Sequence, residues 1–399
     1  MSNGGGWRIR YECPQCGAPV ALGEAVRVLS CPYCRSRLYL DLPDRPRYFL
    51  PPPGDGDDLF FVPYRRRRGL VFTMAPGGVT ARYLDTNHIH VDLPHLPLSL
   101  GVRPQAMTLN ILGPAAAGLF LRPGPQEPYG VGAPGSEVFI GEGESLIYSP
   151  FYVRDRRIWD AFLRRPVAPL GDTPVERLGA LAPEERRDVR FVAAICPRCG
   201  GDLAGEGEAA VLTCGNCDSA WTCRKGALGL VPHALKEGPP EALYLPFWRL
   251  RVALEGLEMD SVGDLIRLAN LPRVVGPQEA GRPLHFWVPA FKINPALFLR
   301  WCRQLTVYQP GEDLTVTLSG ARLFPATLPE EEALAAVPLI LAQIVTDKRL
   351  FFRALPGLKV RPAGSLLFYQ PFVTRNRELL HAELGLTMDM NALRFGTKL

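Results

Sequence analysis

The sequence predicts a mainly β protein with small α content that is internally duplicated, each copy being a four-cysteine metal-binding hairpin followed by a β-rich domain. Four observations support this prediction. Two cysteine quartets share one spacing, and matching segments recur in the same order in both halves. Short apolar runs are separated by many turn residues, with 39 Gly and 40 Pro among 399 residues. No long helical periodicity precedes Val175, which favours strands in the first half.

Each cysteine quartet consists of two CxxC pairs with 14 residues between them. One CxxC turn holds two thiolates near a metal ion, and a hairpin arm brings two such turns together. This spacing resembles that of four-cysteine zinc-ribbon domains, although the resemblance covers only the two cysteine segments. It implies two Zn²⁺ ions per chain, each in a closed site whose four positions are filled by protein. The predicted metal ligands are Cys13, Cys16, Cys31, Cys34, Cys196, Cys199, Cys214 and Cys217.

Two alternatives to zinc stay open at this point. Tetrahedral sulfur ligation also suits iron, as in rubredoxin-like sites, and the thiols could instead be oxidised or unliganded. Gly17 and Gly200 each follow the first CxxC pair of a quartet. We expect these glycines to relieve crowding near the thiolates.

The duplication extends beyond the cysteines. Cys13 and Cys196 are 183 positions apart, and Pro63 and Pro246 have the same offset. A second match has an offset of 221, between Tyr148-Ser149-Pro150-Phe151 and Tyr369-Gln370-Pro371-Phe372. The same order of segments in both halves predicts two similar domains, in which we expect the prolines to lie at strand edges or bulges.

The segment boundaries follow from the repeat and from stretches rich in Pro and Gly. A helix start with three acidic residues after Pro329 precedes an apolar run, and this predicts a packed helix in the second copy only. The predicted organisation is zinc ribbon 1 at 1–45, β-rich domain 1 at 46–168, a partly helical linker at 169–192, zinc ribbon 2 at 193–226, and β-rich domain 2 at 227–399 with an inserted helix near 329–346.

Composition and charge narrow the functional classes. The formal charge is +5 and is shared by both halves, so neither half is a concentrated basic module of the kind that binds nucleic acid. No apolar run is long enough to span a membrane, and the N-terminal residues do not have the pattern of a signal peptide. Metal-spaced thiols favour a reducing compartment, so we expect a cytoplasmic protein.

No catalytic motif is visible, which predicts that the protein is not an enzyme and has no small-molecule substrate. The favoured interpretation is a non-catalytic cytoplasmic zinc-binding adaptor, scaffold or assembly-type protein with an unidentified protein partner. Nucleic-acid binding is the first alternative. A redox or electron-transfer protein with iron in the cysteine sites is the second.

Arginines at alternate positions are the remaining signal. Arg66 and Arg68 correspond to Arg249 and Arg251 in the second copy, and paired arginines also follow both Y-x-P-F segments. Shared positions favour an internal network of ion pairs that joins these motifs. Only the first copy has Arg65 and Arg67, which are therefore predicted to contact a partner from a strand exposed on both faces.

Overall fold

A computed structural model describes residues 8–41, 47–51, 59–91, 93, 96–100, 108–112, 136–141, 144–171, 190–205, 207–311 and 314–396. The chain forms two compact units. Unit 1 comprises Met1–Arg68, Leu84–Val131 and Glu142–Ala193. Unit 2 comprises Gly69–Tyr83, Gly132–Gly141 and Ala194–Leu399. Part of the predicted β-rich domain 1 therefore belongs to unit 2. Strands take up 47% and helices 17%, which confirms the mainly β prediction.

Unit 1 contains ribbon one and a curved sheet built around β10, in which β10 pairs with β6, β5 and β11. Its strands are β1 (Arg8–Glu12), β2 (Pro19–Gly23), β3 (Val28–Ser30), β4 (Arg37–Asp41), β5 (Arg47–Phe49), the first part of β6 (Phe60–Ala75), the last part of β7 (Gly78–Ile89), β8 (Thr108–Leu112), β10 (Glu144–Arg154), β11 (Arg157–Asp160), β12 (Arg165–Pro169) and β13 (Arg190–Ala193).

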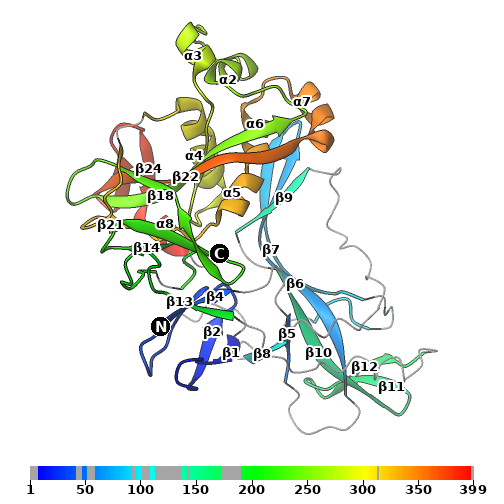
Figure 1. The fold of residues 1–399 in the computed structure, drawn as a ribbon. Helices are drawn as coiled ribbons and strands as arrows, with labels where there is room; N and C mark the ends of the chain where they lie inside the picture. Colours follow the sequence, from blue (N-terminus) through cyan, green and yellow to red (C-terminus); the bar gives the residue numbers. More distant parts are fainter. Residues whose placement is uncertain are drawn as a thin grey trace. The chain divides into compact units, whose positions relative to one another are not determined.

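Unit 2 contains ribbon two and a second curved sheet built around the long strands β18 and β22, which run side by side in Figure 1. Its strands are β9 (Glu137–Ile140), β14 (Leu212–Cys214), β15 (Ser219–Arg224), β16 (Ala227–Val231), β17 (His233–Lys236), β18 (Leu243–Glu255), β19 (Phe286–Pro289), β20 (Leu314–Thr315), β21 (Arg322–Leu323), β22 (Lys359–Arg375), β23 (Glu378–His381) and β24 (Leu386–Asp389). Its helices are α2 (Val262–Leu268), α3 (Pro277–Gly281), α4 (Pro295–Tyr308), α5 (Glu330–Ala335), α6 (Val337–Ile344), α7 (Lys348–Ala354), the 3₁₀ turn η2 (Leu355–Gly357) and α8 (Met390–Gly396).

Strand register confirms the duplication. Pro63 of β6 lies opposite Tyr148 of β10, and Pro246 of β18 lies opposite Tyr369 of β22. In both units the second of these long strands also pairs in parallel with a short strand, β5 or β17, and continues into an antiparallel hairpin with β11 or β23. A register shift of one residue would reverse which side chains face the core, so equal register indicates equal packing.

The two units also share a turn that follows the strand β11 in unit 1 and the strand β23 in unit 2. Asp160 and His381 are 221 positions apart, and both are buried. The Asp160 carboxylate accepts a hydrogen bond from the N–H of Leu163, and the His381 Nδ1 accepts one from the N–H of Leu384. Different side chains thus satisfy the same turn donor, and sequence comparison alone does not reveal this equivalence.

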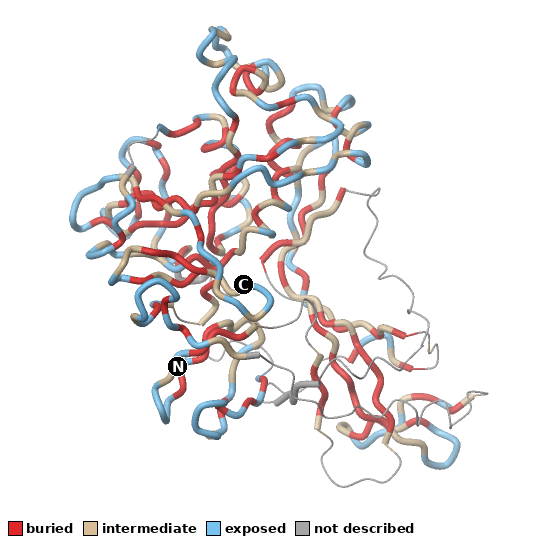
Figure 2. The backbone as a smooth tube through the Cα atoms, in the orientation of Figure 1, coloured by how far each residue is buried: buried red, intermediate tan, exposed pale blue. Residues whose placement is uncertain are grey.

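The tip of the β6–β7 hairpin belongs to the core of unit 2. Phe72 is fully buried, and its ring lies 5.8 Å from that of Phe298 in α4. Met74 and Ile140 join the same apolar cluster, and the Gly141 N–H donates to the Glu332 carboxylate of α5 over 2.6 Å. Figure 2 shows buried backbone, in red, along the central strands of both units. A segment of the first copy therefore completes the core of the second.

Several sequence expectations need correction. The predicted helix near 329–346 is two helices, α5 and α6, because Pro338 lacks an N–H and α6 starts just before it. The expectation that the prolines lie at edges or bulges does not hold for Pro246, because β18 has neighbours on both sides and its bulge lies at Arg251 and Val252. Pro246 lies inside β18, between the residues that pair with β21 and those that pair with β19, and neither pairing includes it. Most of the predicted linker, 172–189, lies outside the described residues.

None of the helices in the described part of the chain has both the length and the apolar character that crossing a bilayer requires.

Candidate metal centres

Ribbon one brings its four cysteines together at the ends of two hairpins. Cys13 and Cys16 lie in the turn between β1 and β2, and Cys31 and Cys34 lie in the turn between β3 and β4. We call each CxxC turn a knuckle. The Sγ of Cys13 is 3.7 Å from that of Cys34, and the Sγ of Cys16 is 3.8 Å from that of Cys31.

Ribbon two repeats this arrangement. Cys196 and Cys217 have their Sγ atoms 3.6 Å apart, and Cys199 and Cys214 have theirs 3.5 Å apart. In both ribbons the four ligand atoms lie within 4.8 Å of one another. The sequence prediction of two four-cysteine clusters that can each hold a metal ion is confirmed.

The sulfur positions fit a tetrahedral metal. A metal–sulfur bond of about 2.3 Å in a regular tetrahedron places neighbouring sulfurs about 3.8 Å apart. The spacings above come close to that value, whereas a disulfide would place two sulfurs about 2.05 Å apart. None of the ten cysteines, all of which the structure describes, forms a disulfide. The geometry suits both zinc and iron, because both metals bind four thiolates in this shape.

Backbone conformation explains the knuckle sequences. Gly17 and Gly200 have φ values of 71° and 73°, a region that glycine adopts without strain. Nothing lies within 4 Å of a Cβ added at either glycine. These glycines therefore serve backbone geometry, and the expectation that they relieve crowding near the thiolates is wrong. The second knuckles reach the same conformation at Arg35 and Asp218, with φ values of 61° and 50°.

Sequence reasoning missed a serine next to each cluster. The Oγ of Ser36 lies 3.0 Å from the Sγ of Cys34, and the Oγ of Ser219 lies 3.0 Å from the Sγ of Cys217. The two serines are 183 positions apart, so the shared motif C-x-x-C-x-S was a readable signal. The Ser36 hydroxyl, with its backbone N–H, lowers the pKa of Cys34 to about 6. Such contacts favour the thiolate, which is the form that binds metal.

Hydrogen bonds connect the second knuckle of ribbon two to a peptide turn elsewhere in unit 2. The Asp218 carboxylate accepts hydrogen bonds from the backbone N–H groups of Leu318 and Ser319, both over 2.8 Å. The Ser319 hydroxyl lies 2.7 Å from the same carboxylate oxygen and 2.9 Å from the carbonyl of Gly215, inside the knuckle. These contacts hold the pKa of Asp218 below its usual range, with the Ser319 hydroxyl as the largest cause. This knuckle thus binds a peptide turn.

Trp221 lies in β15 of ribbon two and is 8% exposed. Its indole Nε1–H donates to the Ser219 hydroxyl over 2.8 Å. The serine next to the thiolates is therefore itself held by a buried ring. Leu38 occupies the matching position of ribbon one, so that serine lacks an indole donor there.

The arginine strand of copy one is engaged within unit 1. Arg65 forms a two-pronged ion pair with Glu144, with both N···O distances 2.8 Å, and the Arg67 Nε lies 3.8 Å from the same carboxylate. Both arginines are half-buried. The prediction that Arg65 and Arg67 contact a protein partner stays a prediction, and such a contact would have to share or displace Glu144.

The sequence predicted that this strand is exposed on both faces, and the burial of Arg66 shows that this prediction is wrong. Arg66 is 4% exposed and pairs with Glu24 and Asp85, while Tyr64 beside it is fully buried. The expected link between the two arginine motifs does not form at Arg154, whose side chain is 67% exposed and pairs with its neighbour Asp155. Arg251 is also exposed in copy two, and Arg249 is half-buried.

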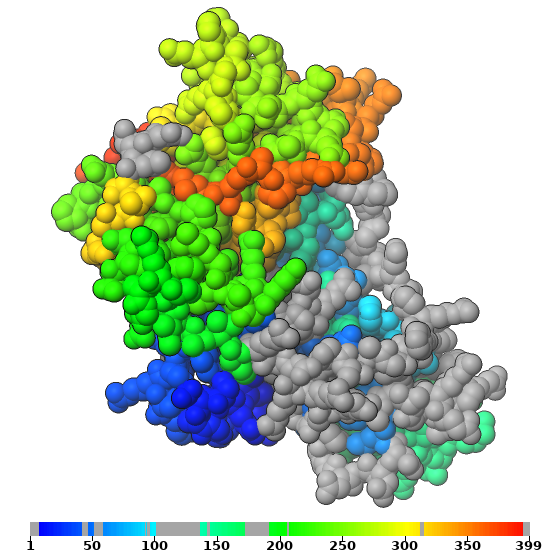
Figure 3. Space-filling model, viewed as in Figure 1, coloured from blue at the N-terminus to red at the C-terminus, as the bar shows by residue number. Residues whose placement is uncertain are grey.

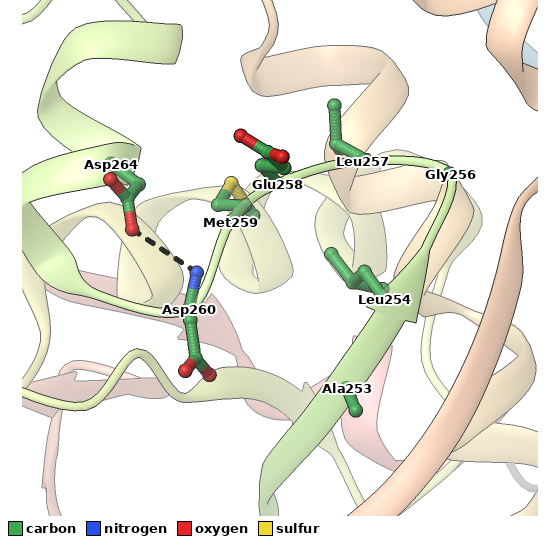
Figure 4. A pocket seen from close by; sticks show the side chains of 8 residues that line it. All are labelled: Ala253, Leu254, Gly256, Leu257, Glu258, Met259, Asp260 and Asp264. Carbon is green, nitrogen blue, oxygen red and sulfur yellow. Dashed lines mark hydrogen bonds between the residues drawn. The ribbon is translucent and has the colours of Figure 1, made fainter.

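The described part of unit 2 has hollows on its surface, and two of them are lined by charged residues. One, of about 840 Å³, adjoins the start of α2 and includes Glu258, Asp260 and Asp264 (Figure 4). Asp264 serves the helix cap there, accepting from the N–H groups of Asp260 and Ser261. The other, of about 710 Å³, runs along α4 and is lined by residues that include Arg273, Arg300 and Arg303. Neither contains a described cluster of three or more potential metal ligands.

Comparisons of the chain with protein-family models, with curated protein sequences and with solved structures find no match.

Proposed function

We propose that the protein is a non-catalytic adaptor or scaffold whose two ribbons are stabilised by zinc and serve as protein-contact modules in the reducing cytoplasm. One observation carries the proposal: the second knuckle of ribbon two holds a peptide turn through Asp218 and Gly215. A metal hairpin that already binds protein inside the chain is a suitable module for binding protein outside it. The closed four-thiolate geometry supports a structural metal, because a catalytic zinc keeps one position for water.

Zinc is preferred to iron because the CxxC-x14-CxxC spacing resembles that of zinc ribbons. The serine hydroxyls near Cys34 and Cys217 support either metal. The electron-transfer alternative requires iron in these sites and predicts a coloured protein with visible absorption from iron–thiolate bonds. A colourless protein with bound zinc would exclude that alternative.

The experiment is affinity capture of partners from the native host with the tagged full-length chain, followed by mass spectrometry. We expect a defined protein to be captured and to be lost when Cys31→Ser disrupts ribbon one. Cys223→Ser is the matched control, because this half-buried cysteine lies outside both quartets. The control should keep the partner. Capture that survives loss of both metal sites, using Cys31→Ser with Cys214→Ser, would refute the proposal.

The same capture experiment distinguishes the adaptor proposal from the alternative that the protein binds nucleic acid. Binding to phosphates falls steeply with added salt and is abolished by nuclease, whereas a protein contact survives nuclease treatment. Capture of nucleic acid alone, lost on raising the salt from 50 to 200 mM, would support that alternative instead.

A further inference from the structure

In and next to the second knuckle of ribbon one lie three exposed residues, and two of their counterparts in ribbon two are bonded to a peptide turn or buried. Tyr33 is 65% exposed, and Arg35 and Arg37 are also exposed. Their side chains make no hydrogen bond or ion pair with the described part of the chain. We call these three residues the knuckle surface. Ribbon one, in blue, reaches the molecular surface in Figure 3.

The matching positions in ribbon two, 183 residues later, are Asn216, Asp218 and Ala220. Ala220 is fully buried and belongs to the apolar core of unit 2. Asp218 holds the turn at Leu318 and Ser319. The duplication therefore allows a direct comparison at the positions of Arg35 and Arg37. Their counterparts in ribbon two are bonded to a peptide turn or buried, whereas both positions are exposed in ribbon one.

The two copies have opposite hydrogen-bonding character at this surface. Asp218 is an acceptor, and it receives the N–H and hydroxyl donors of the turn. Arg35, at the same backbone position with the same left-handed conformation, carries only donors. Where ribbon two has Ala220, ribbon one has Arg37, which adds a second cation to this surface. The complementary segment for ribbon one must therefore offer acceptors and negative charge.

We propose that the knuckle surface binds an acidic turn of a partner protein, with Arg35 and Arg37 pairing its carboxylates and Tyr33 packing on it. The proposal rests on the adaptor function above and names the chemistry of its partner. Arginine binds carboxylates in a two-pronged geometry, and tyrosine and arginine are among the residues enriched at the energetically important positions of protein interfaces. A peptide is favoured over nucleic acid because the matching surface of ribbon two holds a peptide turn.

Site-specific crosslinking tests the contact directly. Tyr33 is replaced by p-benzoylphenylalanine in the full-length chain, the native host is irradiated, and the crosslinked peptide is sequenced. We expect a crosslink to a segment of another protein that contains at least two Asp or Glu residues. The charge reversal Arg35→Glu with Arg37→Glu should lower the crosslink yield by ~10-fold or more, as the loss of two charge-assisted contacts predicts.

Matched controls keep the result interpretable. The photo-reactive residue at Asn216, the corresponding exposed position of ribbon two, should not yield the same crosslink. The charge-reversed chain must keep its zinc content and melting temperature, which excludes unfolding as the cause. A crosslink to nucleic acid, to a segment without acidic residues, or one unaffected by the charge reversal would overturn the proposal.

The two proposals fail in different ways. If partner capture depends on the zinc sites but Tyr33 gives no crosslink, the knuckle surface is wrong and the adaptor function stands. If no protein is captured under any condition, the adaptor function itself is wrong.

Discussion

The hydroxyl of Ser36 lies 3.0 Å from the Sγ of Cys34, and the same 3.0 Å separates Ser219 from Cys217. When the cluster binds metal, the thiolate accepts the hydroxyl hydrogen, so the serine supports the negative charge that the metal requires. We expect Ser36→Ala to weaken metal retention by ~10–100-fold, measured by competition with a chelator. Ser30→Ala, at an exposed position in the same ribbon, is the control and should have no effect.

Elemental analysis of the purified chain should find two zinc ions, one per quartet. Cys31→Ser should leave one zinc and raise amide exchange throughout β1–β4, because metal binding supplies the folding energy of so small a hairpin. Exchange in β14–β16 of ribbon two should be unchanged. One equivalent in the unmodified chain, or iron in place of zinc, would contradict this.

Arg66 should matter more for stability than any exposed arginine. Replacing Arg66 with Met should lower the free energy of unfolding by about 1.5–3 kcal/mol, because Glu24 and Asp85 lose charge-assisted hydrogen bonds to a buried guanidinium. Glu24 keeps only its longer contact with Arg68, at 3.9 Å. Arg154→Ser should cost about 1 kcal/mol or less, since that ion pair is exposed. Urea unfolding of both variants measures the difference, and equal costs would show that burial does not decide the role of these arginines.

His381 should make unit 2 sensitive to acid. Burial, helped by the nearby charge of Lys236, lowers the pKa of His381 from 6.5 to about 4. Its Nε2–H donates to Gln370, and its Nδ1 accepts from Leu384, an arrangement that only the neutral ring can make. Between pH 6.5 and 4 the unfolded chain therefore takes up a proton that the folded chain does not, so stability falls as the pH falls.

Thermal unfolding across that pH range tests the role of His381. The variant His381→Asn should be less stable at pH 7 but should lose less additional stability on acidification than the unmodified chain. A variant with the same slope between pH 6.5 and 4 would show that other groups cause the acid sensitivity.

The hairpin tip should contribute to the stability of unit 2 although it comes from the first copy. Phe72→Ala should destabilise by about 3–5 kcal/mol, because the ring is fully buried against α4. Hydrogen exchange should accelerate in α4 and leave ribbon one unaffected. Thr80→Ala, an exposed change in the same hairpin, is the control. Faster exchange confined to unit 1 would contradict the assignment of this tip to unit 2.

The metal clusters and the duplication could be predicted from the sequence because both are local. A CxxC pair forms its knuckle from four consecutive residues, and fixed offsets of 183 and 221 identify matched strands without knowledge of their neighbours. The turn donors, by contrast, are satisfied by Asp160 in one copy and His381 in the other, so their equivalence is visible only in space.

Contacts between residues far apart in the sequence decided which charged and apolar side chains are buried. The alternation of arginines in β6 was readable, but the burial of Arg66 depends on Glu24 and Asp85, which lie 42 and 19 positions away. The placement of Phe72 in the core of unit 2 depends on α4, more than two hundred residues later in the chain. The sequence by itself determined which residues can bind a metal and which segments are repeated, because those depend on neighbours in the chain. Only the tertiary structure decided which charges are buried, which knuckle is covered by its own domain and which is left exposed, because burial depends on residues far apart in the sequence that packing brings together.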